Sequence, residues 1–310
     1  MDPQVSIIIV NYKTAALIRN CVDSLREKTK EVSYEIIIVD NSNDNNEWSS
    51  LTELTKQFSY IRTINPGRNE GFGRASNYGA TIAKGTYLLF LNSDTLLIND
   101  AVSILFKTIT SDSKIGAIGP NMYDENGKPH HSFVRRETNR SELIFRRSMF
   151  SAIQRHFIKN DGFNYTNKPI EISGYLCGAC LMVPAELFWN IGPFDPEIFM
   201  YSEDNLLCYL LRKNGYKLIN NPNAKIIHLE GRSDSSVYSK QKIQNVVFGD
   251  YIRQLRAYGF KKAKKFLKTA SKVYRRAYLR KKIFHKSGWE NDKRLSEEYA
   301  RFFAEVNSVI

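Results

Sequence analysis

The sequence predicts an α/β fold: a doubly wound, mostly parallel β-sheet with helices on both of its faces. The first half of the chain alternates short runs of β-branched and aliphatic residues with stretches whose apolar residues recur at helical spacing. Continuous apolar runs are typical of parallel strands that are covered on both sides. Because crossovers between parallel strands are right-handed, this alternation winds helices onto both faces of the sheet.

The expected elements follow one another along the chain. Strands are expected over residues 5–10, 34–39, 60–64, 86–91 and 224–228. Helices are expected over residues 17–25, 51–58, 75–83, 101–109 and 207–212, with Gly215 capping the last one. The stretch from 116 to 228 is less regular, with strand-like content over 171–184 and an aromatic strand over 198–201.

The sequence argues against three classes of protein: proteins with a membrane-spanning helix, secreted proteins and disulfide scaffolds. No run of about 18 apolar residues is present, which argues against a membrane-spanning helix. The first apolar run follows Asp2 rather than a basic segment, so it is not typical of a secretory signal. The four cysteines are too few for a disulfide scaffold, and Cys177 and Cys180 precede an apolar strand rather than a helix, so we expect packing roles for them. The expected location is the cytoplasm.

Charge is concentrated near the C-terminus. The chain has a formal net charge of +13, and residues 251–289 contain fourteen Lys or Arg and no Asp or Glu. The other 271 residues therefore sum to −1. We expect a near-neutral body followed by a basic, amphipathic helical region over residues 236–310.

This basic region has an apolar stripe at helical spacing. Its members are Ala263, Phe266, Leu267, Ala270, Val273, Tyr274, Ala277 and Tyr278. A basic amphipathic helix with aromatic residues predicts binding to an anionic membrane surface. Two alternatives stay open: the stripe packs on the rest of the chain, or the basic face binds nucleic acid, since cationic residues alone do not distinguish lipid phosphates from RNA.

Polar residues directly follow three of the expected strands, as Asn11-Tyr12, Asp40-Asn41-Ser42 and Asn92-Ser93-Asp94. Ligands on doubly wound sheets bind beyond the carboxyl ends of the strands, so these clusters are expected to meet in one site. Each cluster alone is also explained by the preference of Asp, Asn and Ser for turns and helix N-caps.

Seven motifs in order resemble the family 2 inverting glycosyltransferases, in particular the bacterial branch of rhamnosyl- and galactofuranosyltransferase-like proteins. They are VSIIIVNYKT, IIIVDNSN, NEGFGRASNYGA, YLLFLNSDT, SGYLCGACLMV, GPFDPEIFMYSEDNLLCYLLRKNGYK and IIHLEG. The resemblance covers residues 5–232. It implies a GT-A type, Rossmann-like fold over residues 1–235, with a nucleotide-sugar half over about 1–115 and an acceptor half over 116–235.

The resemblance implies a divalent cation, Mg²⁺ or Mn²⁺. A departing nucleoside diphosphate gains charge, and a hard cation with oxygen ligands neutralises it. Asp94 matches the last carboxylate of the family's acidic triplet and His228 matches a second metal ligand, although a histidine at a strand end also has structural uses. Asn92 replaces the first Asp of the triplet and is expected to hold the ribose or a metal-bound water.

The resemblance also assigns the donor site. Asp40 matches the residue that accepts a hydrogen bond from the ring N–H of uracil or thymine. Asn11 and Tyr12 are expected to flank the base and ribose, with the Tyr12 ring available for stacking. The loop containing Asn69 and Gly71 is expected to let the backbone approach the nucleotide closely. The implied donor is a dTDP- or UDP-sugar, with rhamnose as a candidate sugar.

Asp204 is the expected catalytic base. Displacement at the anomeric carbon needs a carboxylate that takes the proton of the acceptor hydroxyl, and Asp204 matches that residue of the family. Gly178, Tyr201 and Glu203 are assigned to the acceptor site. The alternative is that Glu203 and Asp204 only complement a helix N-terminus. The chain has Leu206 where relatives often carry another Asp, which affects the acceptor site rather than the base.

Together these features predict an inverting glycosyltransferase that works at the cytoplasmic face of the cell membrane. Its acceptor is expected to be a glycan or a lipid-linked molecule in bacterial surface polysaccharide synthesis. Because every expected catalytic residue precedes residue 233, deletion beyond about residue 250 is expected to spare donor hydrolysis. The competing hypotheses are an inactive nucleotide-binding scaffold and an RNA-binding protein.

Overall fold

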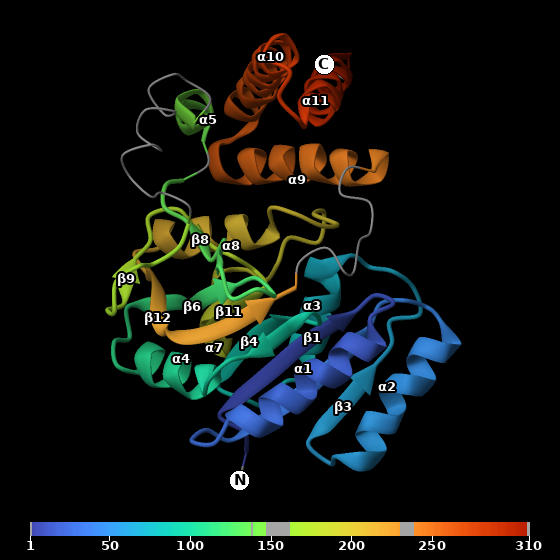
Figure 1. The fold of residues 1–310 in the computed structure, drawn as a ribbon, viewed down its shortest axis with the longest axis vertical. Helices are drawn as coiled ribbons and strands as arrows, with labels where there is room; N and C mark the ends of the chain where they lie inside the picture. The colour runs from blue at the N-terminus through green and yellow to red at the C-terminus, as the bar shows by residue number, and fades with distance from the viewer. Residues whose placement is uncertain (1, 138, 147–161, 230–238, 309–310) are drawn as a thin grey trace.

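The computed structural model describes residues 2–137, 139–146, 162–229 and 239–308, and shows an α/β core next to a group of C-terminal helices (Figure 1). The first half contains β1 (Val5–Asn11), α1 (Ala15–Lys28), β2 (Tyr34–Asp40), α2 (Asn45–Gln57), β3 (Ile61–Ile64), α3 (Phe72–Thr81), β4 (Tyr87–Asn92), β5 (Thr95–Leu97) and α4 (Ala101–Thr110). All the strands and helices expected in this half are confirmed.

The second half of the core is built from shorter pieces. They are β6 (Ile115–Tyr123), β7 (Pro129–His130), β8 (Phe133–Val134), α5 (Arg140–Arg146), β9 (Ile170–Glu171), β10 (Tyr175–Leu176), β11 (Cys180–Pro184), α7 (Ala185–Ile191), α8 (Glu203–Lys213) and β12 (Lys217–His228). Gly215, with a φ of 84°, follows the end of α8 in the left-handed conformation expected of a cap residue.

The main sheet has the strand order β3-β2-β1-β4-β11-β6-β12-β5, with β7 beside β6 and β9 beside β12. The strands β3, β2, β1 and β4 are parallel to one another, as expected. The sheet becomes mixed at β11, which runs antiparallel to both β4 and β6. The purely parallel part of the sheet therefore ends at β4.

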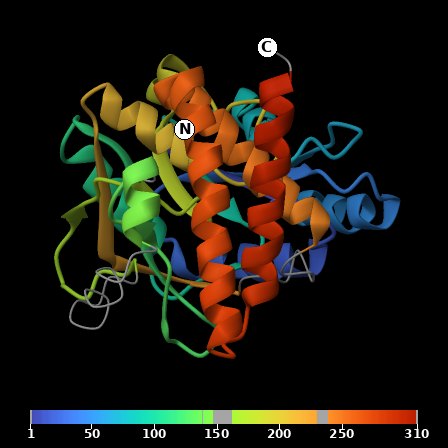
Figure 2. The same ribbon diagram turned by 90° about the horizontal axis from the view of Figure 1, so that it is seen from above.

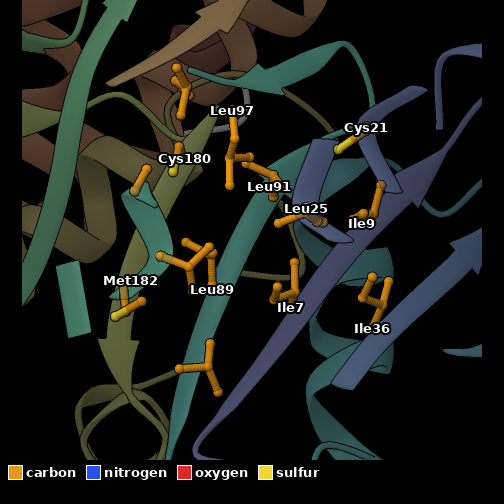
Figure 3. Close-up of a cluster of buried hydrophobic side chains, with 14 of the residues drawn as sticks. Ile7, Ile9, Cys21, Leu25, Ile36, Leu89, Leu91, Leu97, Cys180 and Met182 are labelled. Carbon is orange, nitrogen blue, oxygen red and sulfur yellow. The ribbon is translucent and has the colours of Figure 1, made fainter. Parts of the chain in front are cut away.

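Side chains that alternate along the strands form a core on each face. Ile7, Ile9, Ile36, Leu89 and Leu91 are buried on the face that α1, α2 and α4 cover (Figure 3). Ile8, Ile37 and Phe90 point to the other face and pack with residues of α3, α7 and α8. This alternation explains why the strand sequences are apolar throughout.

One expected strand is wrong. Residues 198–201 form no strand, because Tyr201 and Ser202 have φ angles of 72° and 78° and so lie in the left-handed region. The carbonyl of Phe199 accepts a hydrogen bond from the backbone N–H of Phe72 instead of pairing with a strand. The segment is a tight turn that leads into α8.

The C-terminal region consists of α9 (Lys240–Tyr258), α10 (Phe260–Ile283) and α11 (Trp289–Ser308). α10 and α11 lie side by side, with α5 beside α10 (Figure 2). α9 lies between this pair and α8 (Figure 1). In the described parts of the chain, no helix is both long enough and apolar enough to cross a bilayer.

The apolar stripe of α10 is not available to a membrane. Phe266, Leu267 and Ala270 are buried against α9 and α11, in a cluster that includes Val247 and Tyr299. The alternative that the stripe packs within the protein is therefore the correct one, and the expectation that it enters a membrane is wrong. The periodicity is the same in both cases, since any covered helix face is apolar.

Candidate active site

The polar strand ends converge as the sequence predicts. In the pairing of β1 with β2, Asn11 lies opposite Asp40, and in the pairing of β1 with β4, Val10 lies opposite Asn92. The hydroxyl of Thr14 donates to Ser93 Oγ at 2.9 Å, which connects the loop after β1 to the loop after β4. The carboxyl edge of the parallel strands is therefore one continuous polar surface.

Asp40 and Asn11 are committed to internal hydrogen bonds. Asp40 is fully buried, and its carboxylate accepts from Asn11 Nδ2 at 2.9 Å, from Ser42 and from Asn65 Nδ2 at 3.2 Å. Asn11 also donates to Glu47, and its Oδ1 accepts from Thr14. Both side chains hold the strand ends in place, and their direct contact with a nucleotide stays a prediction. The ring of Tyr12 is 40% exposed and accessible for stacking.

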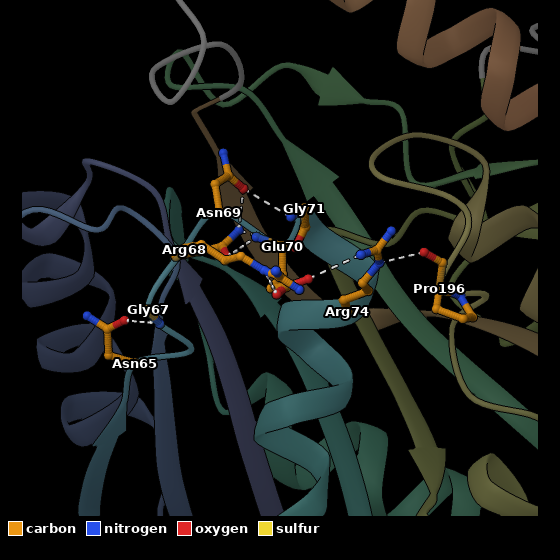
Figure 4. Close-up of polar contacts among 9 residues, drawn as sticks. Asn65, Gly67, Arg68, Asn69, Glu70, Gly71, Arg74 and Pro196 are labelled. Carbon is orange, nitrogen blue, oxygen red and sulfur yellow. Dashed lines mark hydrogen bonds and ion pairs between the residues drawn. The ribbon is translucent and has the colours of Figure 1, made fainter.

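The loop of Asn69 and Gly71 is held rigidly beside the sheet edge (Figure 4). Asn69 Oδ1 accepts from Asn41 Nδ2 at 2.9 Å and from the backbone N–H of Gly71 at 3.0 Å. Gly71 has a φ of 78°, and a Cβ atom there would lie 2.1 Å from the carbonyl oxygen of Phe199. Glycine is required at this position both by its backbone conformation and by the close approach of residue 199.

Glu70 is a functional neighbour that the sequence analysis missed. It is buried, forms ion pairs with Arg68 and Arg74, and has its pKa lowered chiefly by the hydrogen bond from Arg68. Arg74 also donates to the carbonyl of Pro196 at 2.5 Å (Figure 4). This cluster therefore ties the donor-side loop to the segment that precedes α8.

Asp94 and His228 come together as a pair of potential metal ligands. β5 pairs antiparallel with β12, so that His228 lies opposite Thr95. This register places His228 Nε2 3.4 Å from Asp94 Oδ1 and 3.4 Å from Asn92 Nδ2, with Asp94 and His228 both buried. The sequence predicted this meeting from residues that are more than 130 positions apart.

The pair has the donor atoms that Mg²⁺ or Mn²⁺ uses, a carboxylate oxygen and an imidazole nitrogen. Nδ1 of His228 has no hydrogen-bond partner among the described residues, so neither ring nitrogen is held by a strong internal bond. Within the described ranges no group of three His, Cys, Asp or Glu side chains could hold a metal ion. The two side chains fit part of a site for such a cation.

Asp204 occupies the first turn of α8. Its Oδ2 accepts from the backbone N–H of Gly178 at 2.9 Å, and its Oδ1 accepts from the backbone N–H of Asn205 at 2.7 Å. Burial raises the pKa of the Asp204 carboxyl above its usual range. A raised pKa makes the carboxylate a stronger base, as general base catalysis requires.

A two-residue bridge connects Asp204 to Asn92. The N–H of Gly178 binds Asp204, and the carbonyl of the next residue, Ala179, accepts from the backbone N–H of Asn92 at 2.9 Å. A Cβ atom on Gly178 would lie 3.1 Å from the Cβ of Asp204. The expected base and the end of β4, two residues before Asp94, therefore bond to the same short stretch of chain.

Glu203 and Tyr201 precede the base in the sequence, by one residue and by three residues. Glu203 is buried, its Cβ lies 3.7 Å from where a Cβ on Gly73 would be, and burial together with the charge of Asp204 raises the pKa of Glu203 to about 8. Its Oε2 has no hydrogen-bond partner within the described chain. Glu203 thus points toward the start of α3, and the assignments of both residues to the acceptor stay predictions.

Two adjacent histidines near the site were also missed. His131 has an electrostatic interaction that lowers the pKa of Asp204, opposing the larger effect of burial. The ring of His130 makes an edge contact with the ring of His228, with centroids 5.6 Å apart. They follow a turn in the least regular part of the sequence, where no periodicity marks a position as close to the sheet edge.

The cysteines behave as packing residues. All four are free thiols, and Cys21, Cys180 and Cys208 are buried. Burial raises the pKa of each of these three thiols, which removes the thiolate form that redox or metal chemistry needs.

The sequence model of glycosyl transferase family 2 matches residues 6–192, which is more than half of the chain. The chain belongs to this family. It is a glycosyltransferase with the GT-A fold, and its C-terminal helices lie beyond the matched range.

Curated relatives match most of the chain at low identity. The N-acetylglucosaminyl-diphospho-decaprenol L-rhamnosyltransferase of Mycobacterium tuberculosis is 23% identical over 251 residues, covering 75% of this chain and 78% of the relative. A hexosyltransferase of low-salt glycan biosynthesis from Haloferax volcanii is 27% identical over 225 residues, covering 70% of this chain and 64% of the relative.

Two solved structures share the fold. The mannosyltransferase of Pyrobaculum calidifontis, in complex with GDP-Man and Mn²⁺, has a TM-score of 0.59 at 14% identity and covers 100% of this chain and 88% of its own. The structure of GalNAc-T7 with UDP, GalNAc and Mn²⁺ has a TM-score of 0.58 at 19% identity and covers 87% of this chain and 55% of its own.

Proposed function

We propose that this glycosyltransferase is metal-dependent and inverting, and transfers a sugar from a dTDP- or UDP-sugar to a hydroxyl of a glycan or lipid-linked acceptor in bacterial surface polysaccharide synthesis. Rhamnose is the candidate sugar, because a rhamnosyltransferase is among the relatives that match three-quarters of the chain. The observation that supports the proposal is the Gly178-Ala179 stretch, which bonds Asp204 through Gly178 and Asn92 through Ala179, while the Asn92 side chain lies 3.4 Å from His228.

In the proposed reaction Asp204 takes the proton of the acceptor hydroxyl. The acceptor oxygen forms a bond to the anomeric carbon as the bond from that carbon to the diphosphate oxygen breaks, and the electron pair leaves with the diphosphate. The attack and the departure are on opposite faces, so the configuration inverts. The backbone N–H groups of Gly178 and Asn205 hold the Asp204 carboxylate in a fixed direction for this step.

Asp94 and His228 would hold the divalent cation, and the diphosphate oxygens of the donor would complete its ligands. When bound, the cation neutralises the negative charge that develops on the leaving diphosphate. Because the described residues offer two ligands here, metal affinity and donor affinity should depend strongly on each other. The manganese in the two similar structures supports this assignment.

The test is a screen of donor hydrolysis, measured as release of nucleoside diphosphate from UDP- and dTDP-sugars with and without Mn²⁺. The proposal expects manganese-dependent release from at least one of these donors. Release that does not change when the metal is chelated would contradict metal dependence. No release from any donor, together with unimpaired nucleotide binding, would favour the non-catalytic scaffold.

We further propose that the outer face of α10 attaches the enzyme to the cytoplasmic surface of an anionic membrane. A groove of about 590 Å³ between α5 and α10 is lined by the cationic residues Arg140, Lys265, Lys268, Lys272, Arg276 and Arg280. Ile283 and Phe284, at the end of α10, are 69% and 66% exposed. Cations would bind lipid headgroups at about 1 kcal/mol each before screening, while the two apolar side chains enter the interface.

Sedimentation with phosphatidylglycerol vesicles tests this attachment. Replacement of both Ile283 and Phe284 by Ser should remove the part of the binding that survives high salt. Trp189→Ser is the matched control, because Trp189 is 42% exposed on α7, in the sheet-covering part of the fold. Equal losses in the two variants, or equally strong binding to RNA, would overturn the membrane assignment.

A further inference from the structure

The turn that presents Asp204 has an unusual backbone. Tyr201 and Ser202 immediately precede α8, and both have positive φ angles. A non-glycine residue in this region is strained and persists only where surrounding contacts fix it. Two such residues in succession therefore require a support, and the described contacts show where it comes from.

The first support is the backbone of α9. Gly249 lies so close to the turn that a Cβ atom there would be 2.3 Å from the carbonyl oxygen of Tyr201. The same Cβ would be 3.6 Å from a methyl group of Ile198. Glycine in the middle of a helix is less favourable than alanine, so its presence here is explained by the approach of the turn.

The second support is the carboxylate of Asp250. Ser202 Oγ donates to Asp250 Oδ1 at 3.1 Å. The same carboxylate accepts from the buried Arg253 at 3.1 Å and from the hydroxyl of Tyr299 on α11 at 2.5 Å. The Tyr299 ring stacks on Tyr274 of α10 at 5.6 Å. Asp250 thus links the turn before Asp204 to all three C-terminal helices.

The opposite side of the turn contacts the donor-side loop. The carbonyl of Phe199 accepts from the N–H of Phe72 at 2.9 Å and packs against Gly71. The segment that carries the base is therefore held between the loop that begins α3 and the helix α9. A change in α9 would be transmitted to Asp204 through only a few residues.

We propose that Asp250 and Gly249 are positioning residues, and that the C-terminal helices belong to the catalytic unit because they fix the direction in which Asp204 points. The inference rests on the proposed role of Asp204 as the base. It reverses the expectation from the sequence that deletion beyond about residue 250 spares donor hydrolysis, since such a deletion removes Asp250 or its partners.

The test uses the full-length protein and the donor that the wild-type enzyme hydrolyses fastest in the screen. Ser202→Ala and Asp250→Ala should each lower kcat by about 10- to 100-fold with little change in KM for the donor, because a misdirected base slows the reaction without weakening donor binding. The acidic limb of the pH profile of kcat should shift to lower pH, since a loosened Asp204 is better hydrated. The double variant should be little worse than Asp250→Ala alone, because the bond that Ser202→Ala removes is already lost when Asp250 is replaced.

Ser296→Ala is the matched control. Ser296 is a buried serine of α11, and its hydroxyl, like that of Ser202, donates to a residue of the C-terminal helices: it donates to the carbonyl of Ser271 at 3.0 Å, away from the turn. It should leave kcat and the pH profile unchanged. If Asp250→Ala does not fold, Ser202→Ala alone tests the positioning role. It removes a single hydroxyl from the turn, so we expect this variant to fold.

Two results separate the inference from the function it rests on. Wild-type kcat and pH profile in a folded Ser202→Ala protein, or an equal loss in Ser296→Ala, would overturn the positioning role. Unchanged turnover in Asp204→Asn would instead overturn the assignment of the base.

Discussion

Gly178→Ala tests whether the placement of Asp204 matters for the reaction. The added methyl carbon would lie 3.1 Å from the Cβ of Asp204 and 3.2 Å from its Oδ2, against ordinary contacts of 3.4–4 Å. Asp204 would therefore have to move by a few tenths of an ångström. If a 1 Å displacement costs about 100-fold in rate, a shift of about 0.3 Å predicts a fall in kcat of about 4-fold. Donor affinity should stay close to that of the wild type.

The assay is release of nucleoside diphosphate under saturating donor, together with thermal unfolding. Gly119→Ala is the matched control, because its Cβ would make a similarly close contact, 3.3 Å from the carbonyl oxygen of Cys180, without touching Asp204. Both variants should unfold at a lower temperature than the wild type. When kcat is calculated per folded protein, only Gly178→Ala should show a decrease. Equal kcat in the two variants would refute the reasoning.

Three further predictions concern the donor side and pH. Gly71→Ala should abolish donor binding. Gly67→Ala is the control and should preserve it, because Gly67 has the same left-handed φ but nothing lies within 4 Å of the new methyl group. Equal donor affinities of the two variants in calorimetry would contradict the close approach of Phe199. Asp94→Ala should remove the manganese dependence of donor affinity, and an unchanged dependence in the same calorimetry would exclude Asp94 as a ligand. Burial raises the pKa of Glu203 from 4.5, its ordinary value, to about 8 in the folded protein. Between these two pH values the folded protein keeps the proton and the unfolded protein loses it. The free energy of unfolding should therefore fall as the pH rises through this range. Glu203→Gln should reduce this change of the unfolding free energy by up to about 1.4 kcal/mol per pH unit, measured by denaturant unfolding between pH 5 and 8. The same pH dependence in the wild type and the variant would contradict the prediction.

The first half of the fold was predictable because its strands are continuous apolar runs and polar clusters follow three of them. Asn11, Asp40 and Asn92 meet at one edge because parallel register brings the strand ends together. The pairing of His228 with Asp94 was predictable only through the family resemblance. It depends on β12 passing next to β5, which no local pattern of the sequence indicates.

The remaining features depend on contacts that leave no local pattern. Tyr201 and Ser202 adopt left-handed conformations for which glycine is the usual marker, so an aromatic strand was predicted in their place. The apolar face of α10 has the same periodicity whether a membrane or α11 covers it. Only the three-dimensional structure reveals that Asp250 reaches the turn before the base.

The most direct test of the central claim is Asp204→Asn, which keeps the size of the side chain and removes its basicity. Turnover of the donor should fall by about 10²- to 10⁴-fold. Donor affinity in the presence of Mn²⁺ should be preserved, because Asp94 and His228 are unchanged. Near-normal turnover in this variant, with the fold intact, would contradict Asp204 as the base and the mechanism built on it.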